Sequence, residues 1–108
     1  MDRDQYIEVA TATESREQAN TLAKVLVEAR LAAGAQVIGP VGSAFWHDGQ
    51  FGMGEEFRLV LKTRGDKYDA LEGTLIEHHP WTNPEITAKV LDASSDGYTA
   101  WMDKTLDA

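Results

Sequence analysis

Cysteine is absent from this chain of 108 residues. The absence excludes disulfides, thiolate metal sites, iron–sulfur clusters and a cysteine nucleophile. Basic residues are scarce as well, with 10 Lys and Arg against 18 Asp and Glu, which gives a formal net charge of −8. Because an acidic chain without a basic block binds phosphate backbones poorly, we expect no nucleic acid among its partners.

Long apolar runs are also missing, so we expect no segment that crosses a membrane. The first residues, Met1–Tyr6, are polar and acidic and do not resemble a secretory signal peptide, which makes a cytoplasmic location the default expectation. The length fits one domain over residues 1–108, long enough to bury a core without a metal or a disulfide. The surplus of carboxylates suits cations.

The N-terminal part of the sequence has the pattern of a strand followed by a helix. Residues Tyr6–Thr11 are apolar and partly β-branched, which predicts a strand. Ser15, with Gln18 three residues later, is a capping-box pattern that predicts a helix start. Apolar residues then recur with helical spacing at Ala19, Leu22, Ala23 and Leu26. Gly34 is expected to end the helix, since glycine accepts the left-handed conformation.

A hairpin is predicted next. Residues Ala35–Trp46 have strand composition, with a bend or bulge expected at Gly39-Pro40 because proline cannot donate to a sheet ladder. Asp48-Gly49 is a hairpin turn signal. The return strand is expected over Phe57–Lys62, and the preceding residues, Gly52–Glu55, are expected to be irregular.

A second helix is expected after Gly65. Its apolar side chains, Tyr68, Leu71 and Leu75, have helical spacing. Pro80 is expected to end it, because the residue before a proline avoids helical geometry.

The last part of the chain predicts a strand and a short helix. Residues 85–91 alternate, with Ile86, Ala88 and Val90 on one face. The helix is capped by Ser94 or Ser95 and carries on one side Tyr98, Trp101 and Met102. The predicted class is therefore α+β, in the order β-α-β-β-α-β-α. The first six elements match the ferredoxin-like split βαβ arrangement, with the last helix appended.

Enzyme motifs are missing from the sequence. It contains no G-x-S-x-G elbow, no phosphate-cradling glycine loop and no H-E-x-x-H pair. The many carboxylates are typical of a solvated surface rather than of a paired acid and base. We therefore expect no enzyme activity.

Three histidines offer the most informative side chains. His78 and His79 stand directly before Pro80, at the expected end of a helix. Adjacent residues on a helix diverge by about 100°, so the two rings share a metal only if the helix end lets them converge. The alternative is that His79 is partly buried and caps the helix, where a cation is favoured. His47, beside the turn, is expected to be solvated.

The sequence resembles the CutA divalent-cation-tolerance proteins from about Tyr6 to Leu106. The most specific similar segment is the histidine-proline-aromatic run followed by Pro-Glu-Ile at residues 78–86. Further similar segments are Leu26–Ala33, Ser43–Trp46, Glu55-Glu56, Leu61–Thr63 and Ala100-Trp101.

The resemblance implies a ferredoxin-like fold and a tight homotrimer whose long hairpin strands pair across subunits. It also implies a link to copper and other divalent metals, with His78 and His79 as metal ligands beside a cysteine of the first strand. A pocket between subunits would correspond to Glu55, Lys62, Glu85 and Trp101.

The sequence departs from that pattern where the chemistry is most sensitive. Ala10 occupies the position of the family's first-strand cysteine, and Gly34 that of a second cysteine. His47 stands in place of the hairpin tryptophan, with Trp46 one residue earlier, and such an offset in a strand reverses the face of a side chain. Without a thiolate, imidazole and carboxylate favour Cu(II) or Zn(II).

The leading hypothesis is thus a cytoplasmic, trimeric, non-enzymatic metal-binding protein. One alternative is a signalling or scaffold trimer that binds a small anion or metabolite between subunits, with Lys62 and Glu85 orienting the ligand. The other is an altered trimer that serves as an assembly subunit. No cofactor is expected to be needed for folding.

Overall fold

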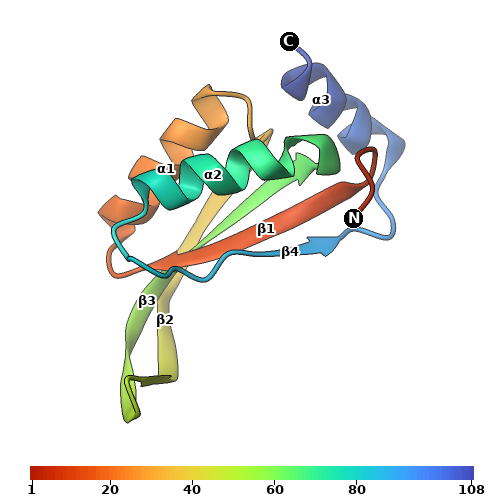
Figure 1. Ribbon diagram of the computed structural model, residues 1–108. Helices are drawn as coiled ribbons and strands as arrows, with labels where there is room; N and C mark the ends of the chain where they lie inside the picture. Colours follow the sequence, from red (N-terminus) through yellow and green to blue (C-terminus); the bar gives the residue numbers. More distant parts are fainter.

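The computed structural model describes all residues from 1 to 108 as one four-stranded sheet with three α-helices (Figure 1). The elements are β1 (Tyr6–Thr13), α1 (Arg16–Glu28), β2 (Gly34–His47), β3 (Gln50–Arg64), α2 (Tyr68–His78), β4 (Thr87–Val90) and α3 (Asp96–Leu106), with a short 3-10 turn before α2. The strand order is β2-β3-β1-β4, and all neighbouring strands are antiparallel. The α+β class predicted from the sequence is confirmed. None of the helices is long and apolar enough to cross a membrane.

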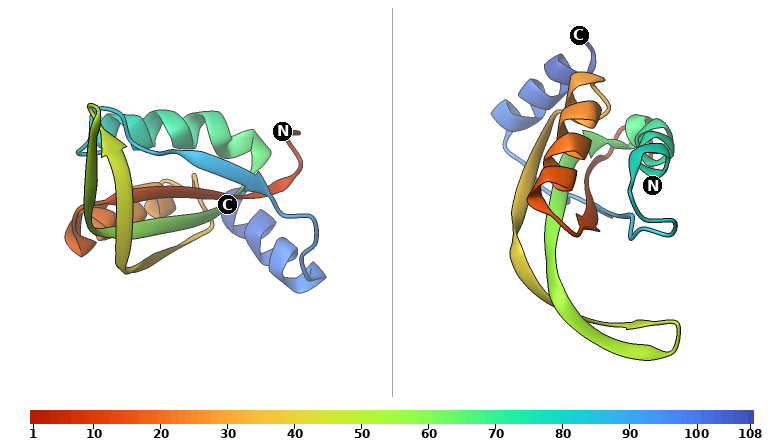
Figure 2. Two further views of the ribbon diagram at one scale, coloured as in Figure 1. Left: turned by 90° about the horizontal axis from the view of Figure 1, so that it is seen from below. Right: turned by 90° about the vertical axis from the view of Figure 1, so that its left-hand side faces the viewer.

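The core lies between the sheet and the pair α1 and α2, which cover one of its faces, while α3 lies against the other face at one end (Figure 2). Alternation along the strands sets this arrangement, since successive side chains point to opposite faces. Val9 of β1 is opposite Leu61 of β3, and both are fully buried. The buried core cluster consists of Ile7, Val9, Leu22, Leu26, Ala32, Leu59, Leu61, Leu71 and Leu75.

Helix α1 starts as predicted but ends earlier than predicted. Ser15 is its N-cap, and its hydroxyl accepts a hydrogen bond from the Gln18 N–H at 3.1 Å. Gly34, the predicted terminator, instead opens β2. Arg30 takes the left-handed position, with φ of 58°. Its N–H and that of the next residue bond back to the Val27 and Leu26 carbonyls, which is the Schellman arrangement that satisfies the last carbonyls of a helix.

The hairpin of β2 and β3 projects from the body of the molecule (Figure 1). The bulge expected at Gly39-Pro40 is present as a register shift in the pairing of the two strands. The prediction of an irregular segment at Gly52–Glu55 is wrong, because these residues pair regularly with β2 as part of β3. Gly52 is opposite Phe45, and a β-carbon there would lie 2.7 Å from the Phe45 ring. The glycine therefore makes room for the aromatic side chain within a paired strand.

The end of α2 and the start of α3 follow the sequence signals. Helix α2 ends at His78, two residues before Pro80. Ser95 caps α3, and β4 spans only Thr87–Val90 of the seven residues predicted. On α3, Met102 is buried, whereas the Tyr98 and Trp101 rings, with centroids 5.4 Å apart, are partly exposed.

An ionic cluster fixes α3 to the sheet. The Arg64 guanidinium contacts the carboxylates of Asp66 at 2.6 Å, Asp103 at 2.9 Å and Asp107 at 2.7 Å. The Tyr6 hydroxyl donates a second hydrogen bond to Asp103, at 2.8 Å. Because the Arg64 side chain is only 14% exposed, these contacts are shielded from water more than ordinary surface pairs are.

Candidate functional site

The candidate metal-binding histidines lie where the C-terminal end of α2 meets the N-terminal end of α1 (Figure 1). His78 is the last residue of α2, and His79 is its C-cap with extended backbone. The change of backbone direction between them separates the two rings. His78 is exposed, whereas His79 is buried, with 8% of its surface accessible.

Both ring nitrogens of His79 are occupied by the protein. Its Nδ1 lies 3.0 Å from the Trp81 backbone nitrogen and accepts that N–H. Its Nε2 therefore carries the proton and donates to the Ala12 carbonyl at 2.9 Å, with the Thr11 hydroxyl at 3.2 Å. Burial lowers the pKa of His79 below its usual value. In this arrangement His79 has no free lone pair for a metal.

His78 has the opposite arrangement. Its Nδ1 lies 3.0 Å from the Thr74 carbonyl one helical turn earlier, so Nδ1–H donates and Nε2 keeps a free lone pair. A metal-binding histidine characteristically donates its other ring N–H to a carbonyl or a carboxylate, which fixes the tautomer and the ring orientation. His78 also lines a surface hollow between the two helices, together with Ser15, Glu17, Gln18, Thr21, Leu22 and Pro80.

The two predicted ligands therefore do not converge on one point. The chain contains no group of three or more His, Cys, Asp or Glu side chains placed to hold a metal ion. His47, the third histidine, is exposed at the hairpin turn beside Asp48, at 3.3 Å, as the sequence predicted. A metal bound by both His78 and His79 would require the hydrogen bonds of His79 to break.

Lys62, predicted in the pocket between subunits, forms an ion pair on the sheet face opposite α1 and α2. Its ammonium lies 2.9 Å from a carboxylate oxygen of Glu8, and Lys89 lies 3.2 Å from the other oxygen. The hydrogen bond from Lys62 is the main reason that the pKa of Glu8 lies below its ordinary value. Lys62 also lines a shallow hollow with Gly34, Ala35, Gln36, Val60 and Tyr98.

Glu85 and Glu55 lie outside that hollow. Both oxygens of Glu85 accept hydrogen bonds from Arg58, at 3.1 and 3.3 Å. This bidentate contact raises the pKa of Arg58. Glu55 is exposed on the projecting hairpin, opposite Gly42.

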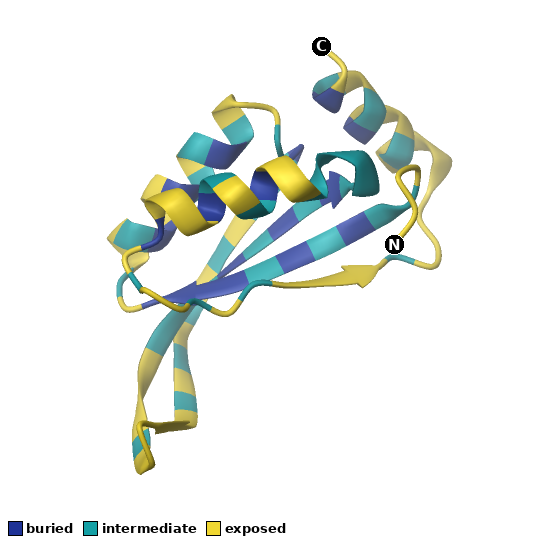
Figure 3. Ribbon diagram, viewed as in Figure 1, coloured by how far each residue is buried: buried dark blue, intermediate teal, exposed yellow.

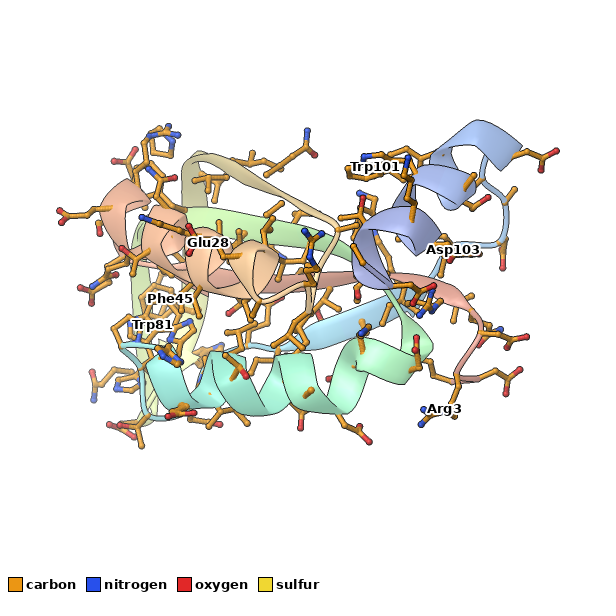
Figure 4. The ribbon with its side chains drawn as sticks, turned by 90° about the horizontal axis from the view of Figure 1, so that it is seen from above. Arg3, Glu28, Phe45, Trp81, Trp101 and Asp103 are labelled. Atoms are coloured by element: carbon orange, nitrogen blue, oxygen red, sulfur yellow. The ribbon has the colours of Figure 1, made fainter.

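Trp101 lies close to the hollow of Lys62. A β-carbon on Gly34, which lines the hollow, would lie 3.4 Å from the Trp101 ring, and the Trp101 and Tyr98 ring centroids are 5.4 Å apart. Figure 4 shows Trp101 on α3, well away from Trp81 at the end of α2. Within one chain, the predicted pocket thus divides into the neighbourhood of Lys62 and Trp101 and two separate glutamates.

Sequence reasoning missed three residues that shape these sites. Glu8 and Arg58 are the partners of Lys62 and Glu85, and each pair joins residues distant in the sequence. Only the strand register could have revealed the first pair, because Glu8 is directly opposite Lys62. The second pair depends on the path of the chain before β4. Glu17, in the first turn of α1, resembles an ordinary helix-start carboxylate until α2 is placed beside it.

Known proteins match this chain over nearly its whole length. A family model described as the CutA1 divalent ion tolerance protein matches residues 7–105. The divalent-cation tolerance protein CutA of Archaeoglobus fulgidus is 31% identical over 86% of this chain and 90% of its own, and that of Thermus thermophilus is 33% identical over 82% and 85%.

Solved structures match it as well. The structure of the Thermus thermophilus protein is 31% identical, covers 89% of this chain and 93% of its own, and superposes with a TM-score of 0.85. The Archaeoglobus fulgidus structure, described as a periplasmic divalent cation tolerance protein, is 29% identical over 94% and 98% of the two chains, with a TM-score of 0.89.

Proposed function

Because this chain belongs to the CutA1 divalent ion tolerance protein family, we propose that it is a trimeric, non-enzymatic protein that binds divalent cations. The proposed domain is ferredoxin-like, which the strand order β2-β3-β1-β4 supports. The proposal includes a cytoplasmic location. The cations proposed are Cu(II) and Zn(II).

The observation that carries the proposal is the free Nε2 of His78. Imidazole nitrogen binds Cu(II) and Zn(II) well, and no thiolate is available to select Cu(I), since Ala10 stands on the strand where the family pattern has cysteine. The role of His79 is then to hold the segment after α2 against β1 through its bonds to Ala12 and Trp81. His79 thereby positions His78 rather than binding the cation.

The proposed trimer is supported by the hairpin tip. Its four large apolar side chains are between 42% and 75% exposed; we call Phe45, Trp46, Phe51 and Met53 the tip cluster. Monomeric proteins rarely leave such a group of neighbouring aromatic side chains uncovered. The outer edge of β2, a strand of 14 residues, also pairs with no other strand, and proteins usually cover such an edge.

Calorimetric titration of the metal-free protein with Cu(II) and Zn(II) tests the proposal. We expect saturable binding by the wild type, loss of that binding in His78→Ala, and unchanged binding in His47→Ala, which removes another exposed histidine, at the far end of the hairpin. Equal affinities in the wild type and in His78→Ala would refute the assignment of the cation to His78.

A second candidate is a small anionic metabolite held near Lys62. The hollow beside the exposed rings of Tyr98 and Trp101 combines an aromatic surface with an ammonium group and the amide of Gln36. Ligand-dependent thermal stabilisation by metabolites, lost in Lys62→Met and absent with metals, would favour this function over cation binding.

A further inference from the structure

We propose that Glu17 is a second protein ligand of the cation at His78, so that the first turn of α1 and the last turn of α2 form one divalent-cation site. This inference rests on the proposed function and specifies its chemistry. The two side chains line the same surface hollow although they are 61 positions apart in the sequence. The ligand set is one imidazole nitrogen and one carboxylate, with water completing the coordination of the cation.

The position of Glu17 is fixed by the cap of α1. The Ser15 hydroxyl accepts the Gln18 N–H, and the Gln18 amide oxygen accepts the Glu14 N–H at 3.1 Å, so a variant of the capping box is formed whose return bond lies one residue before the N-cap. Glu17 lies inside this box, in the first turn. Its backbone is therefore held, and its side chain is exposed to solvent.

No basic side chain neutralises Glu17. Its carboxylate has no ion pair and no hydrogen bond within the chain, whereas the neighbouring Arg16 is engaged elsewhere. The Arg16 guanidinium donates to the Gly39 carbonyl at 2.7 Å and lies 5.1 Å from the centroid of the Phe57 ring. The negative charge of Glu17 is thus available to a cation from solution.

Elimination among the polar groups of the hollow leaves the same pair. The Ser15 hydroxyl accepts the Gln18 N–H, and the Gln18 amide oxygen accepts the Glu14 N–H. The Thr21 hydroxyl donates to the Glu17 backbone carbonyl at 3.0 Å. Apart from the weakly coordinating Thr21 hydroxyl, the side-chain acceptors of this hollow that accept no hydrogen bond are the Glu17 carboxylate and the Nε2 of His78.

This donor pair discriminates among cations. Mixed imidazole and carboxylate ligands suit Cu(II) and Zn(II), whereas Mg(II) and Ca(II) prefer oxygen ligands alone. Two protein ligands on an open surface leave several coordination positions to water, so the cation exchanges readily with solution. Such a site fits sensing or buffering of a cation better than its permanent retention.

The test compares Glu17→Gln with Glu28→Gln, which removes an exposed carboxylate near the other end of the same helix (Figure 4). Calorimetric titrations with Cu(II), Zn(II) and Mg(II) give the affinities. We expect Glu17→Gln to bind Cu(II) and Zn(II) about tenfold more weakly or worse, since even the loss of an outer-shell partner costs that much. Glu28→Gln should match the wild type, and Mg(II) should show no specific binding.

A second readout locates the cation. Substoichiometric Cu(II) broadens nearby amide signals in nitrogen–proton correlation spectra of the labelled protein. Broadening at both residues 16–18 and residues 77–79 supports the shared site. Broadening near His78 alone, together with equal affinities of Glu17→Gln and Glu28→Gln, overturns the inference while the proposed function stands. Cu(II) binding that His78→Ala leaves unchanged overturns both.

Discussion

The body of the molecule and the tip of its hairpin belong to the same sheet but differ in what stabilises them. In the body, strands β1 and β3 bury Val9 and Leu61 completely beneath α1 and α2. At the tip, beyond the bulge of β2, no helix covers the strands, and the residues are mostly exposed (Figure 3). The Trp46 and Phe51 rings pack edge to face across the tip, with their centroids 5.8 Å apart.

The difference shows which part of the chain has a buried core within a single copy. Burial of apolar area stabilises the body at about 25 cal/mol per Å². The tip has the same regular pairing but no second layer, and an isolated two-stranded hairpin is only marginally stable in water. The body therefore stabilises the fold of one chain, whereas the tip is the part that we propose to contact another copy.

The largest expected effect is in the body. Leu61→Ala should lower the free energy of unfolding by about 3 kcal/mol, because the lost side chain leaves a cavity beneath the helices. Urea denaturation followed by circular dichroism measures this loss of unfolding free energy. Ile76→Ala on the solvent side of α2, where Ile76 is half-exposed, is the matched control and should cost well below 1 kcal/mol. Similar losses in the two variants would contradict the described core.

Substitutions in the tip cluster should weaken the association of the chains rather than the folding of one chain. The double variant Trp46→Ala/Phe51→Ala removes two of the three aromatic rings of the tip cluster and should shift the protein toward monomer on dilution. Analytical ultracentrifugation at several concentrations measures the shift, and circular dichroism should show that the body keeps its secondary structure. An unchanged association constant would remove the tip cluster from the proposed interface.

A smaller effect is expected where α3 joins the body. Arg64→Met keeps the length of the side chain but leaves the Asp103 and Asp107 carboxylates without their cation. We expect a loss of about 1–2 kcal/mol, since the guanidinium is largely shielded from water. Hydrogen exchange should speed up in α3 before it does in α1. Uniform acceleration in both helices would show that α3 is not held separately by this cluster.

The pH dependence of His79 should be the smallest effect. Its folded pKa lies below the ordinary 6.5, so the unfolded chain binds this proton first as pH falls. The contribution of neutral His79 to the free energy of unfolding is therefore complete above pH 6.5. Below pH 6.5 this contribution is lost, by at most about 1.4 kcal/mol per pH unit for one proton. The difference in unfolding free energy between wild type and His79→Gln, measured from pH 7.5 to 5, should narrow as pH falls. A constant difference would contradict the buried neutral imidazole.

Local signals predicted much of the body. The Ser15 cap of α1 and the stop before Pro80 depend on residues within one turn of each other, and both were correct. The early end of α1 could not be predicted in this way, because Arg30 adopts a left-handed conformation that glycine usually takes. The glycines of Gly52–Glu55 predict an irregular segment because glycine weakens a strand, but pairing with β2 makes this segment a regular part of β3.

The candidate site was only partly accessible to the same reasoning. The sequence singled out His78 and His79 but could not separate their roles, because the partner of His79, the carbonyl of Ala12, lies 67 positions away. Glu17 was missed for a similar reason, since only the packing of α1 against α2 brings it into the hollow of His78. In both cases tertiary contacts decide which side chain remains free.

The central claim is that the body folds within one chain, whereas the tip is covered by other copies. Light scattering of the metal-free protein tests this claim most directly. If the tip cluster is covered by neighbouring copies, the mass in solution should be three times the chain mass of 11.9 kDa, with no metal required. A well-folded monomer at micromolar concentration would contradict the proposed assembly and would leave the exposed aromatic tip without its explanation.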